Sequence, residues 1–224
     1  TVASLDGTTH VVTITLTGSD DGAVISGTDT GAVQEDGTLA AVGTLAVSDP
    51  DAGQASFVGQ TVADANYGTF AIDASGNWSY VLNNAHADVQ ALTSGDELTR
   101  SFTVASLDGT THVVTITLTG SDDGAVISGT DTGSVQEDGT LSAVGTLTVS
   151  DPDAGQASFV AQTVADANYG TFAIDASGGW SYVLNNTHAD VQEQISGDTL
   201  TRSFTVASLD GTTHVVTITL TGSD

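Results

Sequence analysis

The feature that most constrains this chain is an internal repetition with a period of 102 residues. The segment TVASLDGTTHVVTITLTGSD at residues 1–20 recurs without change at 103–122 and again at 205–224. Residues 23–122 and 125–224 differ from each other at only ten positions. Solenoids repeat every ~20–50 residues, whereas a period of this length matches a whole small domain. The sequence therefore predicts tandem copies of one domain.

The register of the repeat divides the chain into three parts. We expect the C-terminal hairpin of a preceding repeat at 1–20, a β-sandwich repeat at 21–122 and a second at 123–224. Such a register is typical of an excerpt from a longer array. The hairpin alone would expose an apolar stripe on an unpaired strand edge, made of Val12, Ile14 and Leu16. We therefore expect it to pack on something, either a neighbouring copy of the chain or an incomplete sandwich of its own.

Apolar and polar residues alternate through most of each repeat. Within residues 98–129 the alternation marks two strands joined by the turn Asp108-Gly109, because glycine adopts positive φ without steric cost. The same pattern elsewhere gives about seven strands per 100 residues, with a single helix-like segment at 85–92. Short strands separated by regular turns are typical of a sandwich.

The predicted fold class is therefore all-β, with tandem antiparallel β-sandwich domains of the immunoglobulin-like or cadherin-like kind. The residues expected in the core of the first repeat share the inward-facing parity of their strands. They are Leu45, Val47, Phe70, Ile72, Trp78, Tyr80, Leu82, Phe102, Val104, Val114, Ile116 and Leu118. Their equivalents 102 residues later should form the second core.

The charge balance excludes several classes of partner. The chain carries 28 acidic residues against two arginines, Arg100 and Arg202, and its formal net charge is −26. Nucleic acids and anionic membrane surfaces bind basic patches, so neither is expected as a partner. The carboxylates must either be well separated in water or be neutralised by bound cations.

The absence of cysteine also favours bound cations. Small extracellular domains are commonly held together by disulfides, which this chain does not form. Bound calcium is another stabilising device for such domains. No apolar run is long enough to span a bilayer, so membrane insertion is not expected.

Acidic residues gather in the segments that connect the expected strands. Loops of a sandwich cluster at its two ends, so an Asp-x-Asp loop, the Asp-Gly turn and the preceding linker should meet at one end. In the first repeat this set is Asp20, Asp21, Asp49, Asp51 and Asp108; in the second it is Asp122, Asp123, Asp151, Asp153 and Asp210, faced across the junction by Glu35 and Asp36.

Crowded carboxylates without a counter-charge do not all stay ionised. Six to eight hard oxygen ligands are what Ca²⁺ takes. The sequence therefore predicts Ca²⁺ as a cofactor at the domain junctions. The alternative is that these Asp-Gly and Asp-Pro pairs are turn chemistry alone.

Two consecutive segments carry a family resemblance. YGTFAIDASGNWSYVLNN at 67–84 and AHADVQALTSGDELTRSFTVASLDGTTHVVTITLTG at 85–120 resemble the VCBS repeat of very large bacterial surface proteins, and both recur at 169–222. The resemblance implies a secreted, extracellular adhesin of the repeats-in-toxin type, exported by a type I system. The order of acidic elements is also similar to that of cadherin repeats, which implies calcium at the junctions, although the linker is not asparagine-rich.

The remaining polar residues give weaker signals. His10, His112 and His214 follow the Asp-Gly turn, and His86 and His188 precede the helix-like segment; isolated histidines of this kind are expected to pack on the surface or across strands. No nucleophile-elbow or triad pattern is present, so an enzyme is not expected.

Three functions fit these features. The first is a structural extender in which calcium-stiffened repeats contact adjacent identical repeats and carry an adhesive tip. The second is an adhesion module that binds a glycan or a protein. The third is a subunit of an extracellular filament or surface layer, in which neighbouring copies meet through the hairpin at 1–20.

Overall fold

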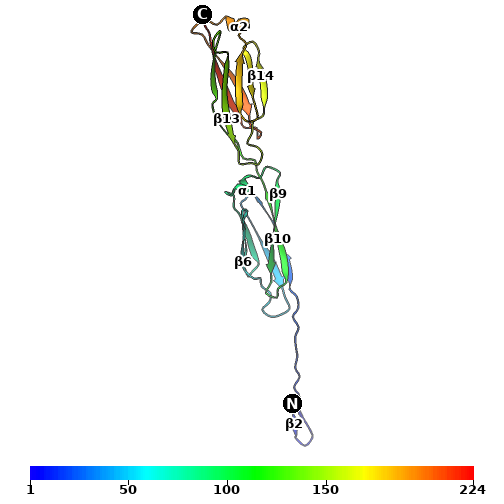
Figure 1. Ribbon diagram of the computed structural model, residues 1–224. Helices are drawn as coiled ribbons and strands as arrows, with labels where there is room; N and C mark the ends of the chain where they lie inside the picture. Colours follow the sequence, from blue (N-terminus) through cyan, green and yellow to red (C-terminus); the bar gives the residue numbers. More distant parts are fainter.

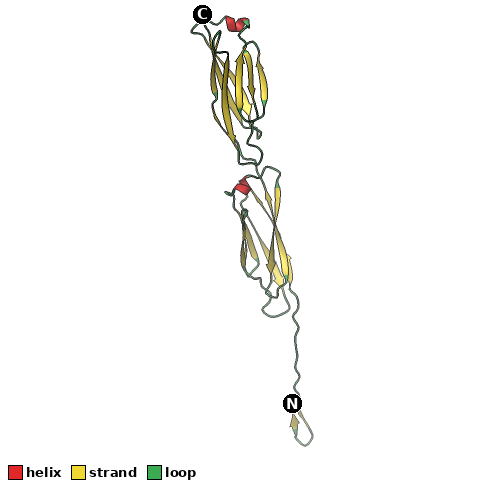
Figure 2. Ribbon diagram, in the orientation of Figure 1, coloured by secondary structure: helices red, strands yellow, loops and turns green.

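Strands dominate the structure, as the alternation predicts: 52% of the residues lie in β-strands and 4% in helices. The computed structural model describes residues 1–224 and contains two β-sandwiches joined end to end, here named unit 1 (21–122) and unit 2 (123–224) (Figure 1). The strands run along the length of each unit, and the connecting loops gather at its two poles (Figure 2). The predicted all-β fold class is confirmed.

Unit 1 contains eight strands and one short helix. They are β3 (Val24–Gly27), β4 (Thr30–Gln34), β5 (Ala40–Ser48), β6 (Gln60–Asp64), β7 (Gly68–Ile72), β8 (Asn77–Leu82), α1 (Ala87–Gln90), β9 (Glu97–Ala105) and β10 (Thr111–Thr119). One layer of the sandwich is a five-stranded sheet in the order β3-β5-β8-β7-β6. The other layer is a three-stranded sheet in the order β4-β10-β9.

Unit 2 repeats this arrangement. Its elements are β11 (Val126–Gly129), β12 (Thr132–Gln136), β13 (Ser142–Ser150), β14 (Gln162–Asp166), β15 (Gly170–Ile174), β16 (Gly179–Leu184), α2 (Ala189–Gln192), β17 (Thr199–Ala207) and β18 (Thr213–Thr221). The sheets are β11-β13-β16-β15-β14 and β12-β18-β17.

One strand pair in each unit departs from the expected antiparallel pattern. β4 pairs with β10 in parallel, with Thr30 opposite Thr115 and Gln34 opposite Thr119. The cause is a change of sheet between β3 and β4, at Gly27, whose φ of 118° is a backbone conformation that favours glycine. This crossing also explains why each unit has eight strands rather than about seven.

The predicted core lies between the two sheets. Every residue expected there is buried except Val47, which is half-buried and packs against the core. Four further residues complete the cluster in unit 1: Val33, Ala41, Phe57 and Val89. Phe70 and Phe102 stack across the sandwich with ring centroids 4.6 Å apart.

Trp78 makes one hydrogen bond to the backbone, and its ring packs closely against the backbone at two glycines. Its indole nitrogen donates a hydrogen bond to the carbonyl oxygen of Thr28 at 2.7 Å. A Cβ at Gly43 would lie 2.6 Å from Cε2 of the ring, and one at Gly31 would lie 2.8 Å from Cη2. These glycines therefore provide the space that the tryptophan occupies.

Replacing Gly43 with alanine is expected to destabilise unit 1 by about 1–3 kcal/mol, because an overfilled core forces side chains off their rotamers. Urea unfolding in a Trp180→Phe background, followed by the fluorescence of Trp78, measures this change. Gly59→Ala is the matched control, since unit 2 already carries Ala161 at the equivalent position. Equal unfolding midpoints for the two variants would contradict the packing argument.

The single arginine of each unit forms an ion pair that the charge balance did not suggest. Arg100 on β9 makes a bidentate contact with the carboxylate of Asp64, which is buried. The hydroxyl of Tyr80 donates to the same carboxylate at 2.9 Å, and the guanidinium lies over the ring of Tyr67. Arg202 repeats the arrangement with Asp166 in unit 2. The buried carboxylates of Asp64 and Asp166 are thus each paired with an arginine.

The N-terminal segment does not pack on either unit of this chain, and its packing on a neighbouring copy stays a prediction. Only β1 (Val2–Ala3) and β2 (Thr9–His10) pair, and the chain then extends to the pole of unit 1 (Figure 1). The apolar stripe is exposed: Ile14 is 87% accessible and Leu16 is 94% accessible. The same sequence in β10 is buried, because there β4 and β9 flank it and the five-stranded sheet covers it.

Candidate metal centre at the junction between the units

The linker between the units comprises residues 120–125, between β10 and β11. Asp210 fixes its C-terminal end. This side chain lies in the β17–β18 turn and accepts hydrogen bonds from the backbone of Ala125 at 2.9 Å and of Thr212 at 3.0 Å. Burial alone would raise the pKa of Asp210, but these bonds and those from the hydroxyls of Ser208 and Thr212 hold it well below its usual range. Asp210 therefore anchors the linker with oxygens that already have partners.

Asp122 connects the two units through the linker. Its Oδ1 accepts a hydrogen bond from the backbone N–H of Ser94 in unit 1 at 2.8 Å and one from the amide of Gln156 in unit 2 at 3.3 Å. A direct backbone hydrogen bond of 3.2 Å joins Ala154 of unit 2 to the carbonyl of Ala91, just after α1. The poles are thus in contact.

The Asp-x-Asp loop of unit 2 faces this linker. The backbone N–H of Asp123 donates to Oδ2 of Asp153 at 2.6 Å, and that of Asp153 donates to Oδ1 of Asp151 at 2.9 Å. One carboxylate oxygen of each of these three residues is buried and has no hydrogen-bond partner. Buried polar atoms are almost always paired, so three such oxygens at one place need an explanation.

Unit 1 contributes Glu35 and Asp36 from the turn after β4. Glu35 is 1% exposed, and it accepts hydrogen bonds from the amide of Gln90 at 3.1 Å and the backbone of Ser121 at 3.2 Å. Asp36 has a φ of 50°, uncommon for a residue other than glycine, and is held by a reciprocal pair of hydrogen bonds with Asn84. Its carboxylate also lies within hydrogen-bond distance of Asp123.

Burial and the neighbouring charges both act on the pKa values of these carboxylates. Burial raises the pKa of Glu35 to about 7, against a partial offset from the Ser121 hydrogen bond, and the charges of Asp123, Asp36 and Asp153 add to the rise. Burial, together with the neighbouring carboxylates, also raises the pKa of Asp123 and of Asp153. The site therefore favours a proton or a cation over a full set of bare charges.

The seven carboxylates that the sequence assigned to this junction lie on the two facing poles and the linker between them. They are Glu35, Asp36, Asp122, Asp123, Asp151, Asp153 and Asp210. The other five predicted residues lie at the opposite pole of unit 1: Asp20, Asp21, Asp49, Asp51 and Asp108. No three acidic or histidine side chains converge tightly enough to form a ready-made metal centre. The orphaned oxygens nevertheless fit a cation that would draw both poles and the linker together.

Several residues of the site were not found from the sequence. Three of them are Gln90, Ser94 and Gln156. Each contributes one hydrogen bond from a side-chain amide or a backbone N–H, and a single group of this kind forms no recognisable sequence motif. His86 also has a role that was not expected: its Nδ1 accepts from the backbone of Asp88 at 3.1 Å and so caps α1, the helix that positions Gln90. His112 on β10 pairs with Asp29, which directly precedes β4, at 3.1 Å, a surface contact of the kind expected.

A family model described as the bacterial cadherin-like domain matches residues 20–120 and 122–222. The structure of the protocadherin gammaB7 EC3-6 cis-dimer is 18% identical, covering 91% of this chain and 48% of that one, with a TM-score of 0.51. The protocadherin GammaB4 extracellular domain is 14% identical, covering 90% of this chain and 33% of that one, with a TM-score of 0.46.

This chain therefore spans about half or less of the length of those structures. The first likeness shows the fold alone. No curated protein matches the chain. None of its helices is long and apolar enough to cross a membrane.

Cadherin-like domains are typically extracellular structural or adhesive modules rather than enzymes, and they generally hold Ca²⁺ at their junctions. The family model covers almost every residue of both units, and its two matches meet at the linker described above. With its two tandem sandwiches and acidic junction, the chain belongs to the bacterial cadherin-like domain family.

Proposed function

We propose that the two units form a calcium-stiffened extender segment of a secreted bacterial adhesin. The observation that carries the proposal is the set of buried, unpartnered carboxylate oxygens on Asp123, Asp151 and Asp153. They come from the linker and from unit 2; in addition to burial, Asp36 of unit 1 raises the pKa of Asp123, and the charges of Asp123 and Asp153 raise the pKa of Glu35. A cation bound there would tie both units to the linker.

Calcium suits this donor set better than other common cations. All donors are hard oxygens, and Ca²⁺ accepts six to eight of them in flexible geometry, with water filling vacant positions. Mg²⁺ demands a near-ideal octahedron at shorter distances. When bound, Ca²⁺ supplies positive charge that offsets the repulsion between the poles, while the hydrogen bonds from Ser94, Gln156 and Ala125 hold the linker in place.

The expected calcium affinity and the net charge of the chain both support an extracellular location for this protein. Extracellular calcium modules bind at about 10⁻⁴–10⁻³ M, so the junction would be empty in a calcium-poor cytosol and filled outside the cell. A net charge of −26 and the resemblance to VCBS repeats support a secreted surface protein whose repeats stiffen on arrival. The near-identity of the units favours a spacer over a specialised binding module.

Calorimetric titration of the full chain with CaCl₂ tests the proposal. We expect heat of binding with a Kd in the range of about 10⁻⁴–10⁻³ M, and little response to MgCl₂. A glycan array probed with the same chain should remain blank. Absence of calcium binding at 10 mM CaCl₂, about ten times the weakest expected Kd, would overturn the proposal.

The raised pKa of Glu35 predicts an unusual pH dependence in chelator. The folded state holds this proton up to about pH 7, above the ordinary value of 4.5, so its stabilising contribution is fully present below pH 4.5. It is lost as the pH rises towards 7, which costs unit 1 roughly 2–3 kcal/mol. Urea unfolding at pH 5 and pH 7.5 measures the change. Glu35→Gln should abolish most of it, and an equal loss in the variant would contradict the assignment.

A further inference from the structure

We infer that the side-chain amide of Asn185 is the acceptor for an N-linked sugar on the folded chain. Two Asn-x-Ser/Thr triplets with a central residue other than proline occur in the sequence: Asn77-Trp78-Ser79 in unit 1 and Asn185-Asn186-Thr187 in unit 2. Such a triplet is the acceptor pattern for N-glycosylation in secreted proteins. Neither triplet occurs in both units, because Gly179 stands at the position of Asn77 and Ala85 at that of Thr187.

The side chain of Asn185 presents a free amide nitrogen. Asn185 directly follows β16, in the exposed loop that leads to α2. The hydroxyl of Thr187 donates to Oδ1 of Asn185 at 3.1 Å, and Nδ2 donates no hydrogen bond within the chain. The hydroxyl therefore fixes the side-chain amide and leaves its nitrogen for a transferring enzyme.

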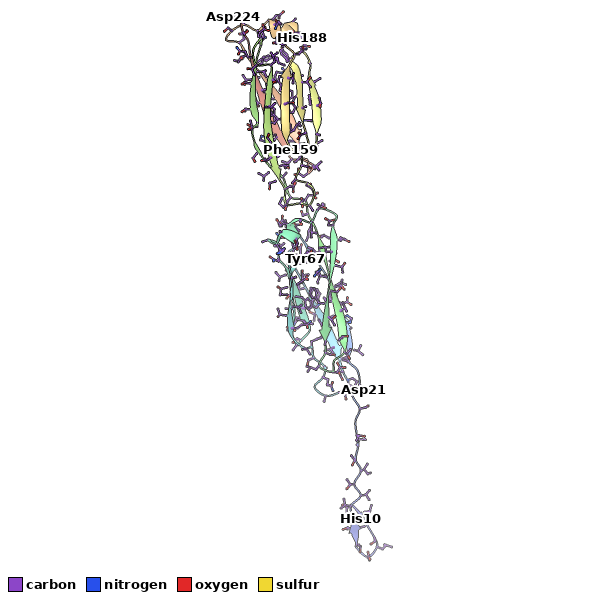
Figure 3. The ribbon with its side chains drawn as sticks, in the orientation of Figure 1. His10, Asp21, Tyr67, Phe159, His188 and Asp224 are labelled. Carbon is purple, nitrogen blue, oxygen red and sulfur yellow. The ribbon has the colours of Figure 1, made fainter.

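The backbone holds this loop in a defined turn. The N–H of Asn185 donates to the carbonyl of Tyr169 at 2.9 Å, and its own carbonyl accepts from the N–H of His188 at 3.1 Å. His188 marks the loop in Figure 3. The central residue, Asn186, makes a reciprocal pair of hydrogen bonds with Asp138, at 2.7 Å and 3.0 Å. Of the two neighbouring asparagines, Asn185 is thus the one with an unused nitrogen.

The equivalent position in unit 1 stays exposed although unit 2 is docked at the same pole. Asn83 is exposed and repeats the turn, with a hydrogen bond to the carbonyl of Tyr67 at 2.9 Å and one from the N–H of His86 at 3.0 Å. Tyr67 marks this place in Figure 3. A following unit therefore leaves the loop accessible. Asn83 lacks the hydroxyl two residues further on, since Ala85 stands there, and no sugar is expected on it.

The triplet of unit 1 is held in the sheet instead. Asn77 begins β8; its Nδ2 donates to Asp73 at 3.0 Å, and its Oδ1 accepts from the hydroxyl of Thr44 at 3.2 Å. The central residue of the triplet, Trp78, is buried in the core. An enzyme that binds the whole triplet would have to pull β8 out of the sheet, so folding protects Asn77 from modification.

The chemistry of the transfer defines the co-substrate. A bond forms between C1 of the sugar and Nδ2 of Asn185, and the bond from C1 to a diphosphate leaving group breaks. Nδ2 loses one proton to a base of the transferring enzyme. The donor is therefore a sugar activated at C1 by a diphosphate, which either a nucleoside or a lipid carries. The product has a bulky, solubilising group on the loop before α2.

Peptide mapping of the full chain from the cells that produce it tests the inference. Cleavage after aspartate releases the matched peptides 74–88 of unit 1 and 176–190 of unit 2, and electron-transfer fragmentation locates any added mass. We expect a sugar on Asn185 and none on Asn77 or Asn83. One monosaccharide indicates a nucleoside diphosphate donor, and an oligosaccharide indicates a lipid-linked donor. Unmodified Asn185, or a sugar on Thr187 in its place, would overturn the inference.

Single substitutions separate the role of the hydroxyl from that of the fold. Thr187→Ala should abolish the modification and Thr187→Ser should retain it; alanine is compatible with this loop, because unit 1 carries Ala85 there. Ala85→Thr should create a new site on Asn83. A sugar retained in Thr187→Ala would contradict the role of the hydroxyl. A sugar on Asn77 at the level of Asn185 would show modification before folding and overturn an acceptor selected by the folded surface.

Discussion

The double substitution Asp151→Asn/Asp153→Asn is expected to make unit 2 more stable than wild type in chelator and less stable than wild type in calcium. In chelator the variant should be slightly more stable than wild type, because it removes two of the crowded negative charges, while the amide nitrogen that replaces each orphaned oxygen is itself a buried polar group. In calcium at 100 times its Kd, wild type should gain about 2.7 kcal/mol and the variant should gain nothing. The two unfolding curves therefore change order on adding calcium.

Urea unfolding of unit 2, followed by Trp180 in a Trp78→Phe background, measures this crossover. Asp73→Asn/Asp175→Asn is the matched control, since it removes the same charge from the β7–β8 and β15–β16 turns. There the carboxylates accept backbone hydrogen bonds from Ser75 and Ser177 at 2.9 Å and have donors of their own. The control should respond to calcium as wild type does. A variant less stable than wild type in both conditions would show that the two carboxylates stabilise the apo fold.

The substitution Asp64→Ala is expected to cost unit 1 about 3–5 kcal/mol, which is most of the stability of a small domain. It removes the one acidic partner of Arg100 and leaves the hydroxyl of Tyr80 without an acceptor in the core. The pKa of Tyr80 is raised far above its ordinary range by burial and by this carboxylate, so the hydroxyl stays protonated and needs an acceptor.

Unit 2 provides an internal reference for this measurement. Asp166 makes the same contacts with Arg202 and Tyr182, and it remains intact in the variant. With Trp78 as the reporter of unit 1, unfolding should occur at a much lower urea concentration, while Trp180 should report an unchanged unit 2. Asp96→Ala, which removes an exposed carboxylate from the same unit, should change unit 1 by less than about 1 kcal/mol. Comparable losses in the two variants would refute a special role for the buried pair.

Much of the fold could be predicted from the sequence because side-chain parity is a local property. Phe70, Trp78 and Ile116 all lie in the core, where the alternation placed them. The grouping of carboxylates at the poles was also accessible, since sandwich topology alone brings loops together at the ends of the strands.

The features that were missed depend on contacts between distant segments. Arg100 and Asp64 are 36 residues apart and meet across the sandwich, a pairing that no periodicity records. The parallel alignment of β4 with β10 follows from a change of sheet at Gly27, and the sequence marks this only as a glycine in a strand. In the same way, Gln90 supports Glu35 from a helix 55 residues further along the chain.

The segment 1–20 shows how strongly context decides structure. Its sequence is identical to 103–122, where Val114 and Ile116 are fully buried, yet at the N-terminus the equivalent Val12 and Ile14 are exposed. The alternating sequence is necessary for this strand, but its apolar residues are buried only where the partner strands β4 and β9 flank it.

The central claim, that calcium at the junction stiffens the array, is tested most directly by the distance distribution between two spin labels. The chain has no cysteine, so Val81→Cys and Val183→Cys introduce unique attachment sites at equivalent exposed positions, 53% and 54% accessible, one on each unit. Double electron–electron resonance then reports how widely the two units move relative to each other. The same labels on the Asp151→Asn/Asp153→Asn chain provide the control.

We predict one narrow distance distribution in calcium and a broad one in chelator for the labelled wild type, because seven carboxylates without cations repel across the linker. The Asp151→Asn/Asp153→Asn chain should show the same width in both conditions. Equal widths in calcium and chelator for wild type would contradict the account.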